Sequence, residues 1–271
     1  MIKPEHIVAI DVEPAEVDCA QAGLLATHTA NTWQPDRSPA DRLRDTLIGK
    51  AAELAWLRYL QRESIACRLW DDMRRDGGRD HAPVDGFVAQ RDAAELLAGD
   101  LFADTARQWQ EGAHFRRGFF AACERRGIFG FEVKSTRIGP RHLAGGQVNY
   151  AAILEDDFLV YPPVRAGALD ESTRQDLISQ KQRAAAAERT PYLLARAYVE
   201  ARDAGLRNAE ASRAVYRVYL VGYMTRPHFF QSPRLRVTTM PQSNKSEQAI
   251  YYAVPLRLGQ NLSGLRQTLG L

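Results

Sequence analysis

A glutamate and a lysine two residues apart on a short apolar segment are the clearest candidates for chemistry in this chain. Glu132 and Lys134 close the run Ile128–Lys134, whose other members are hydrophobic residues or glycine. Side chains alternate between the two faces of a strand, so Phe131 and Val133 are expected on one face and the acid and lysine on the other. A carboxylate beside an ammonium group on a rigid strand is suited to holding a metal ion and a water molecule.

The context of this pair matters more than the pair itself. Of the five lysines, only Lys134 has an acid two residues before it, and the residues that precede it favour a central strand. The simpler alternative is a pair of charge partners that faces solvent.

Hydrolysis of a phosphodiester needs a positioned water, a divalent ion and a group that manages the proton of the water. Glu132 and Asp85 could bind Mg²⁺ through oxygen, the ligand type that this cation prefers. Lys134 could then orient or deprotonate the attacking water. Asp85 is preferred over three other aspartates because it lies in an apolar strand just before a glycine, whereas the others occupy a turn; these are Asp72, Asp76 and Asp80.

A third acid comes from an expected helix. Glu53 has Trp56, Leu57 and Leu60 three, four and seven positions later, so its side of the helix is apolar. The functional interpretation is a carboxylate that faces the sheet and the metal. The alternative is a residue at the rim of the core whose charge reaches water.

Three segments in this order resemble the motifs of the PD-(D/E)xK nuclease superfamily, which has the restriction-endonuclease-like fold: Gly49–Glu53, Pro83–Phe87 and Phe131–Thr136. The resemblance spans residues 45 to 161. It implies that Asp85 and Glu132 bind the metal, that Lys134 acts on the water, and that Glu53 adds a ligand directly or through water. The expected cofactor is Mg²⁺, for which Mn²⁺ would substitute.

The expected fold is a mixed α/β arrangement around one central sheet flanked by helices, a restriction-endonuclease-like core with a helical insertion. Residues 1–40 form an N-terminal subregion, and residues 41–271 form the nuclease domain with the insertion at about 91–126. Asp85 and Glu132 are 47 positions apart, which leaves room for this insertion, a place for a specificity or dimerisation element. Helices are predicted at 41–61 and, broken at Pro191, at 170–204; strands are predicted at 65–70, 84–88, 128–134, 157–161, 215–223 and 250–256.

Composition adds few constraints. The 36 basic residues include only five lysines, which leaves 31 arginines, the side chain best matched to phosphate, although a GC-rich genome produces the same bias. The three cysteines have no zinc-like spacing and are expected to be free thiols. No apolar run is long enough for a bilayer and no signal peptide is evident, so we expect a cytoplasmic protein without a membrane partner.

Other segments give weaker signals. The stretches His114–Phe120 and Arg226–Phe230 carry arginine and aromatic residues that could grip a nucleic-acid backbone or stack on bases, and packing explains the first equally well. Gly145–Tyr150 is expected to be a polar loop. The chain has no phosphate-binding loop, dinucleotide fingerprint or zinc-hydrolase motif.

The leading expectation is therefore a Mg²⁺-dependent endonuclease that hydrolyses DNA, as a restriction or phage-defence enzyme. A homodimer would suit the cutting of both strands, since symmetric halves face symmetric strands. The alternatives are a structure-specific DNA repair nuclease, an RNase, or a catalytically inactive nucleic-acid-binding or assembly module.

Overall fold

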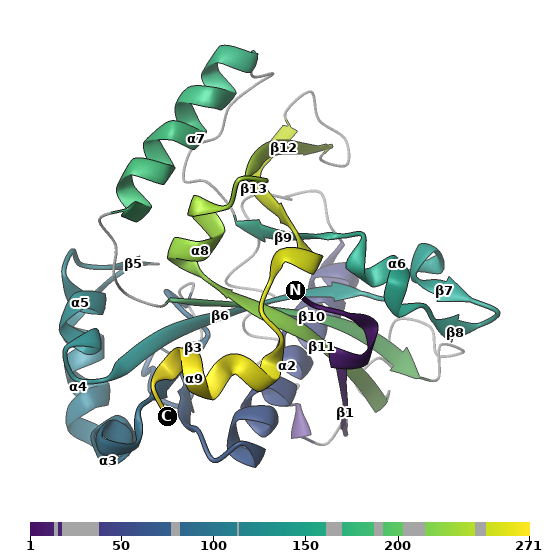
Figure 1. Cartoon of the computed structure of the whole chain (residues 1–271). Helices are drawn as coiled ribbons and strands as arrows, with labels where there is room; N and C mark the ends of the chain where they lie inside the picture. Colours follow the sequence, from purple (N-terminus) through teal and green to yellow (C-terminus); the bar gives the residue numbers. More distant parts are fainter. Residues whose placement is uncertain are drawn as a thin grey trace.

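A mixed sheet of six strands forms the centre of the protein, with helices packed around it (Figure 1). The computed structural model describes residues 1–13, 16–17, 38–76, 82–112, 114–160, 170–186, 192–202, 215–241 and 248–271. The strand order is β1-β11-β10-β6-β3-β2. Among the strands described in this sheet, β6 and β10 alone pair in parallel. The bounds are β1 Val8–Val12, β2 Ala66–Leu69, β3 Gly86–Ala89, β6 Ile128–Arg137, β10 Leu193–Arg202 and β11 Val215–Thr225.

The long helix α2 (Pro39–Arg62) covers one face of this sheet. The Ser38 hydroxyl accepts a hydrogen bond from the Asp41 backbone N–H, and Pro39 occupies the first turn, so both residues favour helix initiation here. Trp56 of the helix is fully buried and its ring meets Phe131 of β6 at a centroid distance of 6.4 Å. This packing fixes the helix over the strand that carries the acid–lysine pair.

The other face of the sheet is covered by a second core. A smaller three-stranded sheet in the order β12-β13-β9 lies on this side with the short helix α8. The strands predicted at 157–161 and 250–256 do form, but they belong to this second sheet. The expectation of a single sheet is therefore wrong. The bounds are β9 Asp157–Val160, β12 Arg236–Pro241, β13 Gln248–Pro255 and α8 Arg226–Gln231.

The segment between β3 and β6 is mainly helical, as expected for an insertion at about 91–126, but it also contains a small hairpin. Its aromatic residues pack into the second core around Phe87, with the Phe102 ring at a centroid distance of 5.2 Å. Its elements are η3 Arg91–Ala93, α3 Ala94–Ala98, α4 Asp100–Trp109, β4 Gln110–Glu111, β5 His114–Phe115 and α5 Phe119–Glu124.

The helix predicted over 170–204 is the main error. Helix α7 spans Glu171–Ala186, but residues 193–202 form β10, a strand between β6 and β11. This segment is rich in Ala, Leu and Arg, which favour helices in isolation. Burial against strands distant in sequence overrides that preference, because Leu193, Ala195 and Ala197 fill one face of the sheet almost without exposure.

Strand β1 and several short elements complete the fold. Strand β1, within the predicted N-terminal subregion, pairs antiparallel with β11 at one edge of the sheet. Beyond β6 come η4 Pro140–His142, the hairpin β7 Leu143–Ala144 and β8 Gln147–Val148, and helix α6 Tyr150–Leu154; α9 Leu265–Leu269 lies near the C-terminus. None of the helices in the described part of the chain has the length and apolar composition needed to span a bilayer.

Candidate active site

The acid–lysine pair, Glu132 and Lys134, lies on β6, and its side chains alternate with their neighbours as expected. Phe131 and Val133 face α2, and Glu132 and Lys134 face the other side of the sheet. The Lys134 ammonium forms an ion pair with the Glu132 carboxylate, and their side chains are 41% and 28% exposed. The pair thus lies at a partly open position that follows the buried part of the strand, Ile128–Phe131.

Asp85 immediately precedes β3 and extends its ladder. Its N–H donates to the Phe131 carbonyl at 3.1 Å, and its own carbonyl accepts from Trp70 N–H at 2.9 Å. Its side-chain Oδ2 accepts from the Val133 N–H at 2.6 Å. Since Val133 stands between Glu132 and Lys134 in sequence, this bond fixes the Asp85 carboxylate beside the acid–lysine pair.

The next residue, Gly86, explains how the strands come so close. A Cβ atom at this position would lie 2.5 Å from both the Arg68 carbonyl oxygen and the Phe131 ring. Only glycine fits between these groups, so the residue after the candidate ligand is dictated by packing.

Electrostatic interactions link the predicted residues further. Burial raises the pKa of the Asp85 carboxyl above its usual range, and the nearby charge of Glu132 raises it further. The charge of Glu132 raises the pKa of Lys134, so this lysine is held in the ammonium form. Burial raises the pKa of the Tyr192 hydroxyl, and the charges of Glu132 and Asp85 raise it further.

Glu53 of α2 lies within electrostatic range of Asp85. It is only 8% exposed, which favours the interpretation of a buried carboxylate over that of a residue at the rim of the core. Burial raises the pKa of its carboxyl and the charge of Asp85 raises it further, while Lys50 opposes both effects. The Lys50 ammonium lies 2.6 Å from Glu53 Oε2 and 2.5 Å from Asp71 Oδ2.

Three residues near the predicted site residues were not predicted from the sequence: Lys50, Asp71 and Tyr192. Lys50 lies one helical turn before Glu53, which is a sequence signal for a neighbour on the same face. Asp71 follows the fully buried Trp70 at the end of β2, a place where sequence alone indicates only a turn. Tyr192 comes into range only through the pairing of β10 with β6, 60 residues away in sequence from Glu132.

Carboxylate oxygens are the ligand type that Mg²⁺ prefers. The acids of this region are Glu53, Asp71, Asp85 and Glu132, and the lysines near them are Lys50 and Lys134. Within the described ranges, no three acidic, His or Cys side chains converge as a ready metal cage. Two of the three predicted carboxylates are instead paired with lysine, namely Glu53 and Glu132.

The alternative aspartates have other partners or lie outside the described residues. Asp76 accepts two hydrogen bonds from Arg74, each at 2.6 Å. Burial raises the pKa of Asp72, and the charge of Asp72 adds to the raised pKa of the Cys67 thiol. Asp80 lies outside the described residues. Asp85 therefore remains the candidate supported by geometry.

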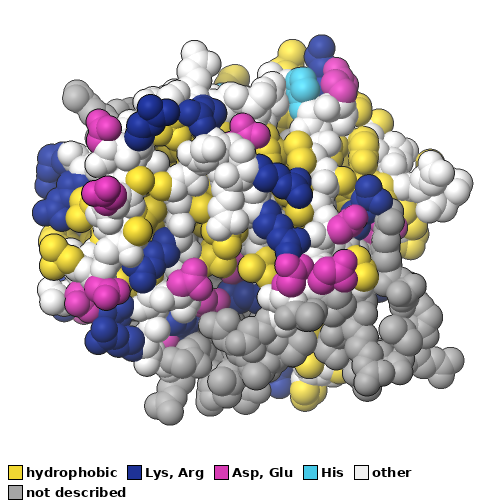
Figure 2. Space-filling view, turned by 90° about the horizontal axis from the view of Figure 1, so that it is seen from below, with side chains coloured by type: hydrophobic (Ala, Val, Ile, Leu, Met, Phe, Trp, Pro, Cys, Tyr) yellow, Lys and Arg dark blue, Asp and Glu magenta, His cyan; other side chains and the backbone are white. Residues whose placement is uncertain are grey.

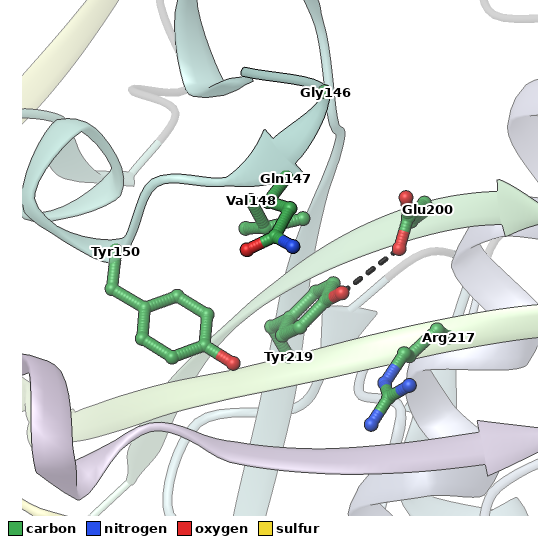
Figure 3. Close-up of a pocket in the computed structure, with 7 residues that line it drawn as sticks. All are labelled: Gly146, Gln147, Val148, Tyr150, Glu200, Arg217 and Tyr219. Carbon is green, nitrogen blue, oxygen red and sulfur yellow. Dashed lines mark hydrogen bonds between the residues drawn. The ribbon is translucent and has the colours of Figure 1, made fainter. Parts of the chain in front are cut away.

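A separate pocket of about 290 Å³ lies between the β7–β8 hairpin, α6 and the ends of β10 and β11 (Figure 3). The Tyr219 hydroxyl donates to Glu200 Oε2 at 2.8 Å, and burial together with this bond raises the pKa of Tyr219 to about 12. Gln147 and Tyr150, expected in a polar loop, line the pocket with Arg217. The pocket offers hydrogen-bonding groups at a place separate from the four predicted residues.

The two stretches rich in arginine and aromatic residues contribute mainly to packing. The Phe119 and Phe229 rings are buried at 2% and 0% exposure, so they are not available to stack on bases. Arg116 and Arg117 are exposed. In Figure 2, the described Lys and Arg side chains on the visible face are scattered among acidic ones.

Comparison with known proteins gave no match: no protein-family model, no curated protein and no solved structure is similar to this chain.

Proposed function

We propose that this protein is a Mg²⁺-dependent endonuclease that hydrolyses DNA phosphodiester bonds, in the role of a restriction or phage-defence enzyme. The observation that carries the proposal is the hydrogen bond from Val133 N–H to the Asp85 carboxylate, which joins two segments 48 positions apart. This bond holds the Asp85 carboxylate beside the segment that carries Glu132 and Lys134. Such a set is what metal-assisted phosphodiester hydrolysis requires.

The order of elements supports the same proposal. Helix α2 is followed by the antiparallel strands β2, β3 and β6, and β10 then pairs in parallel with β6. This order is compatible with a restriction-endonuclease-like core, and the candidate residues occupy α2, the position just before β3 and the middle of β6.

The chemical roles follow from the positions of the side chains. A bound Mg²⁺ would lower the pKa of a water molecule and neutralise negative charge on the phosphate. Asp85 and Glu132 would hold the ion, with Mn²⁺ as a substitute, and Glu53 would contribute directly or through water. Lys134, held as an ammonium by Glu132, would orient the attacking water and offset negative charge that develops on the phosphate.

The same site could serve a structure-specific DNA repair nuclease or an RNase, and an inactive binding module would keep the fold without the chemistry. We infer a homodimer for cutting both strands and a cytoplasmic location, where foreign DNA is encountered. Light scattering in solution would test the dimer, with a monomeric mass as the contrary result.

One assay separates these possibilities. Purified protein is incubated with plasmid DNA in Mg²⁺, in Mn²⁺ and in EDTA, beside Lys134→Ala and the matched surface variant Lys3→Ala. We expect cleavage with either metal, none in EDTA, a rate about 10² to 10⁴-fold lower for Lys134→Ala, and an unchanged rate for Lys3→Ala. Discrete fragments would favour a sequence-specific enzyme. Absence of metal-dependent cleavage of plasmid, single-stranded DNA and RNA by the wild type would refute the proposal.

A further inference from the structure

A lysine lies where two buried carboxylates meet. The Lys50 ammonium bridges Glu53 Oε2 and Asp71 Oδ2 at 2.6 and 2.5 Å. The Glu53 and Asp71 side chains are only 11% and 9% exposed, and that of Lys50 is 19% exposed. Solvent therefore screens these charges little, and the Lys50 ammonium offsets the repulsion between the two carboxylates.

The carboxylates on either side of the ammonium are held in place by other groups. Arg74 donates to the second oxygen of Asp71 at 3.2 Å, and its own side chain is 4% exposed and also bonded to Asp76. Glu53 is carried by a helix packed on the sheet. By contrast, Lys50 sits on a flexible four-carbon stem and can leave without moving the backbone.

This lysine bridge adjoins the proposed metal ligands. The charge of Asp85 acts on Glu53, and the charge of Lys50 acts in turn on Asp85. Glu53 therefore has two possible partners. It forms an ion pair with Lys50, and it is also the acid of α2 that is expected to assist in binding the metal. It cannot give the same oxygen fully to both cations.

We propose that Glu53 and Asp71 form a cation site that the Lys50 ammonium occupies, and that a divalent cation competes with Lys50 for these carboxylates. Lys50 then acts as a built-in competitor that lowers metal affinity and keeps the acids paired until metal and nucleic acid arrive. This inference rests on the proposed function in so far as the metal is the one used for phosphodiester hydrolysis.

The test measures metal binding directly in Lys50→Met, which keeps an unbranched side chain one atom shorter than lysine and removes the charge. Mn²⁺ titration by electron paramagnetic resonance should give a Kd roughly tenfold lower than that of the wild type, a typical size for coupling between two sites. The melting temperature of the variant should fall in EDTA, where Glu53 and Asp71 lose the ammonium that lies between them, and rise more on addition of Mn²⁺ than that of the wild type.

Three further proteins make the result specific. Lys3→Met removes an exposed lysine whose ammonium lies 4.0 Å from Glu5, and it should bind Mn²⁺ as the wild type does. Lys50→Met with Asp71→Asn should lose the gain in affinity, because one of the two acids is gone. Lys50→Gln is a second neutral variant, and it should show the same gain as Lys50→Met.

An unchanged or higher Kd in both neutral Lys50 variants would overturn the inference, and so would failure of both to fold in saturating Mn²⁺. Cleavage of DNA by the wild type is scored separately. A gain in Mn²⁺ affinity without any wild-type cleavage would reject the nuclease and keep the cation site. Cleavage without the gain would do the reverse.

Discussion

At the scale of single residues, Asp85 has a structural role as well as its proposed chemical one. Its carboxylate accepts the Val133 N–H, a backbone donor that β3 does not reach because the pairing of β3 with β6 ends at Gly86 and Phe131. Its negative charge, by contrast, is opposed by burial and by Glu132. The hydrogen bond stabilises the fold, whereas the charge is useful only if a cation binds.

Two substitutions separate these roles. Asp85→Asn keeps an oxygen that can accept the Val133 N–H and removes the charge, so the metal-free protein should be at least as stable as the wild type. Asp85→Ala leaves that N–H unsatisfied and should lower the free energy of unfolding by about 1–3 kcal/mol. Urea unfolding in EDTA measures both values.

Both Asp85 variants should lose metal-dependent cleavage in the plasmid assay. An Asp85→Asn protein as unstable as Asp85→Ala would contradict the role given to the hydrogen bond. An Asp85→Asn protein that cleaves at the wild-type rate would remove Asp85 from the proposed metal site.

The sequence predicted four site residues, and the structure brings Asp85, Glu132 and Lys134 together and sets Glu53 within electrostatic range of Asp85. Their catalytic roles remain predictions. For Glu53, apolar neighbours at helical spacing indicated an apolar side of the helix but left open whether the charge reaches water, and only the packed structure shows its burial. Asp71 could not be predicted, because its contact with Lys50 joins positions 21 apart through a turn whose path depends on tertiary packing.

At the scale of elements, the junction of β3 and β6 tolerates no added volume. A methyl group at Gly86 would meet backbone and ring atoms at 2.5 Å, whereas at Gly49, within α2, nothing lies within 4 Å of the added Cβ. The same substitution should therefore have opposite effects at the two positions.

Gly86→Ala should destabilise the protein by about 1–3 kcal/mol through overpacking. Gly49→Ala should stabilise it by about 0.5–1 kcal/mol, because alanine loses less conformational freedom than glycine when a helix forms. Thermal or urea unfolding of the two variants provides the comparison, and a stabilising Gly86→Ala would show that the strands can separate at little cost.

Strand β10 shows the limit of local patterns. Its Ala and Leu residues favour a helix, and its place beside β6 depends on contacts with residues 62 positions earlier in the chain. By contrast, α2 and β6 were predicted well, because a capping serine and a clear alternation of apolar residues are local signals.

At the scale of the whole molecule, the reactivity of the buried thiols depends on whether the protein is folded. Burial raises the pKa of Cys67 and of Cys123 to about 12, with a further contribution from Asp72 at Cys67. A thiol with such a pKa is about 10⁻⁴ thiolate at pH 8, and only the thiolate reacts. The third thiol, Cys19, lies outside the described residues.

A Cys19→Ser protein should therefore react slowly with Ellman's reagent at pH 8 in its native state and rapidly at both remaining thiols in urea. Cys67 should react first, because it lies half-buried on an edge strand, while Cys123 is 5% exposed inside the fold. Rapid labelling of native Cys123 would contradict the described packing of α5.

The position of β6 between β3 and β10 has a consequence for how the protein fails under stress. It pairs with β3 over Ile128–Phe131 and with β10 over Phe131–Arg137, so we expect its backbone amides to exchange hydrogen mainly on global opening. Partial opening at the edges of the sheet leaves this strand intact. Heat should thus remove activity and fold in one transition, without a folded but inactive stage.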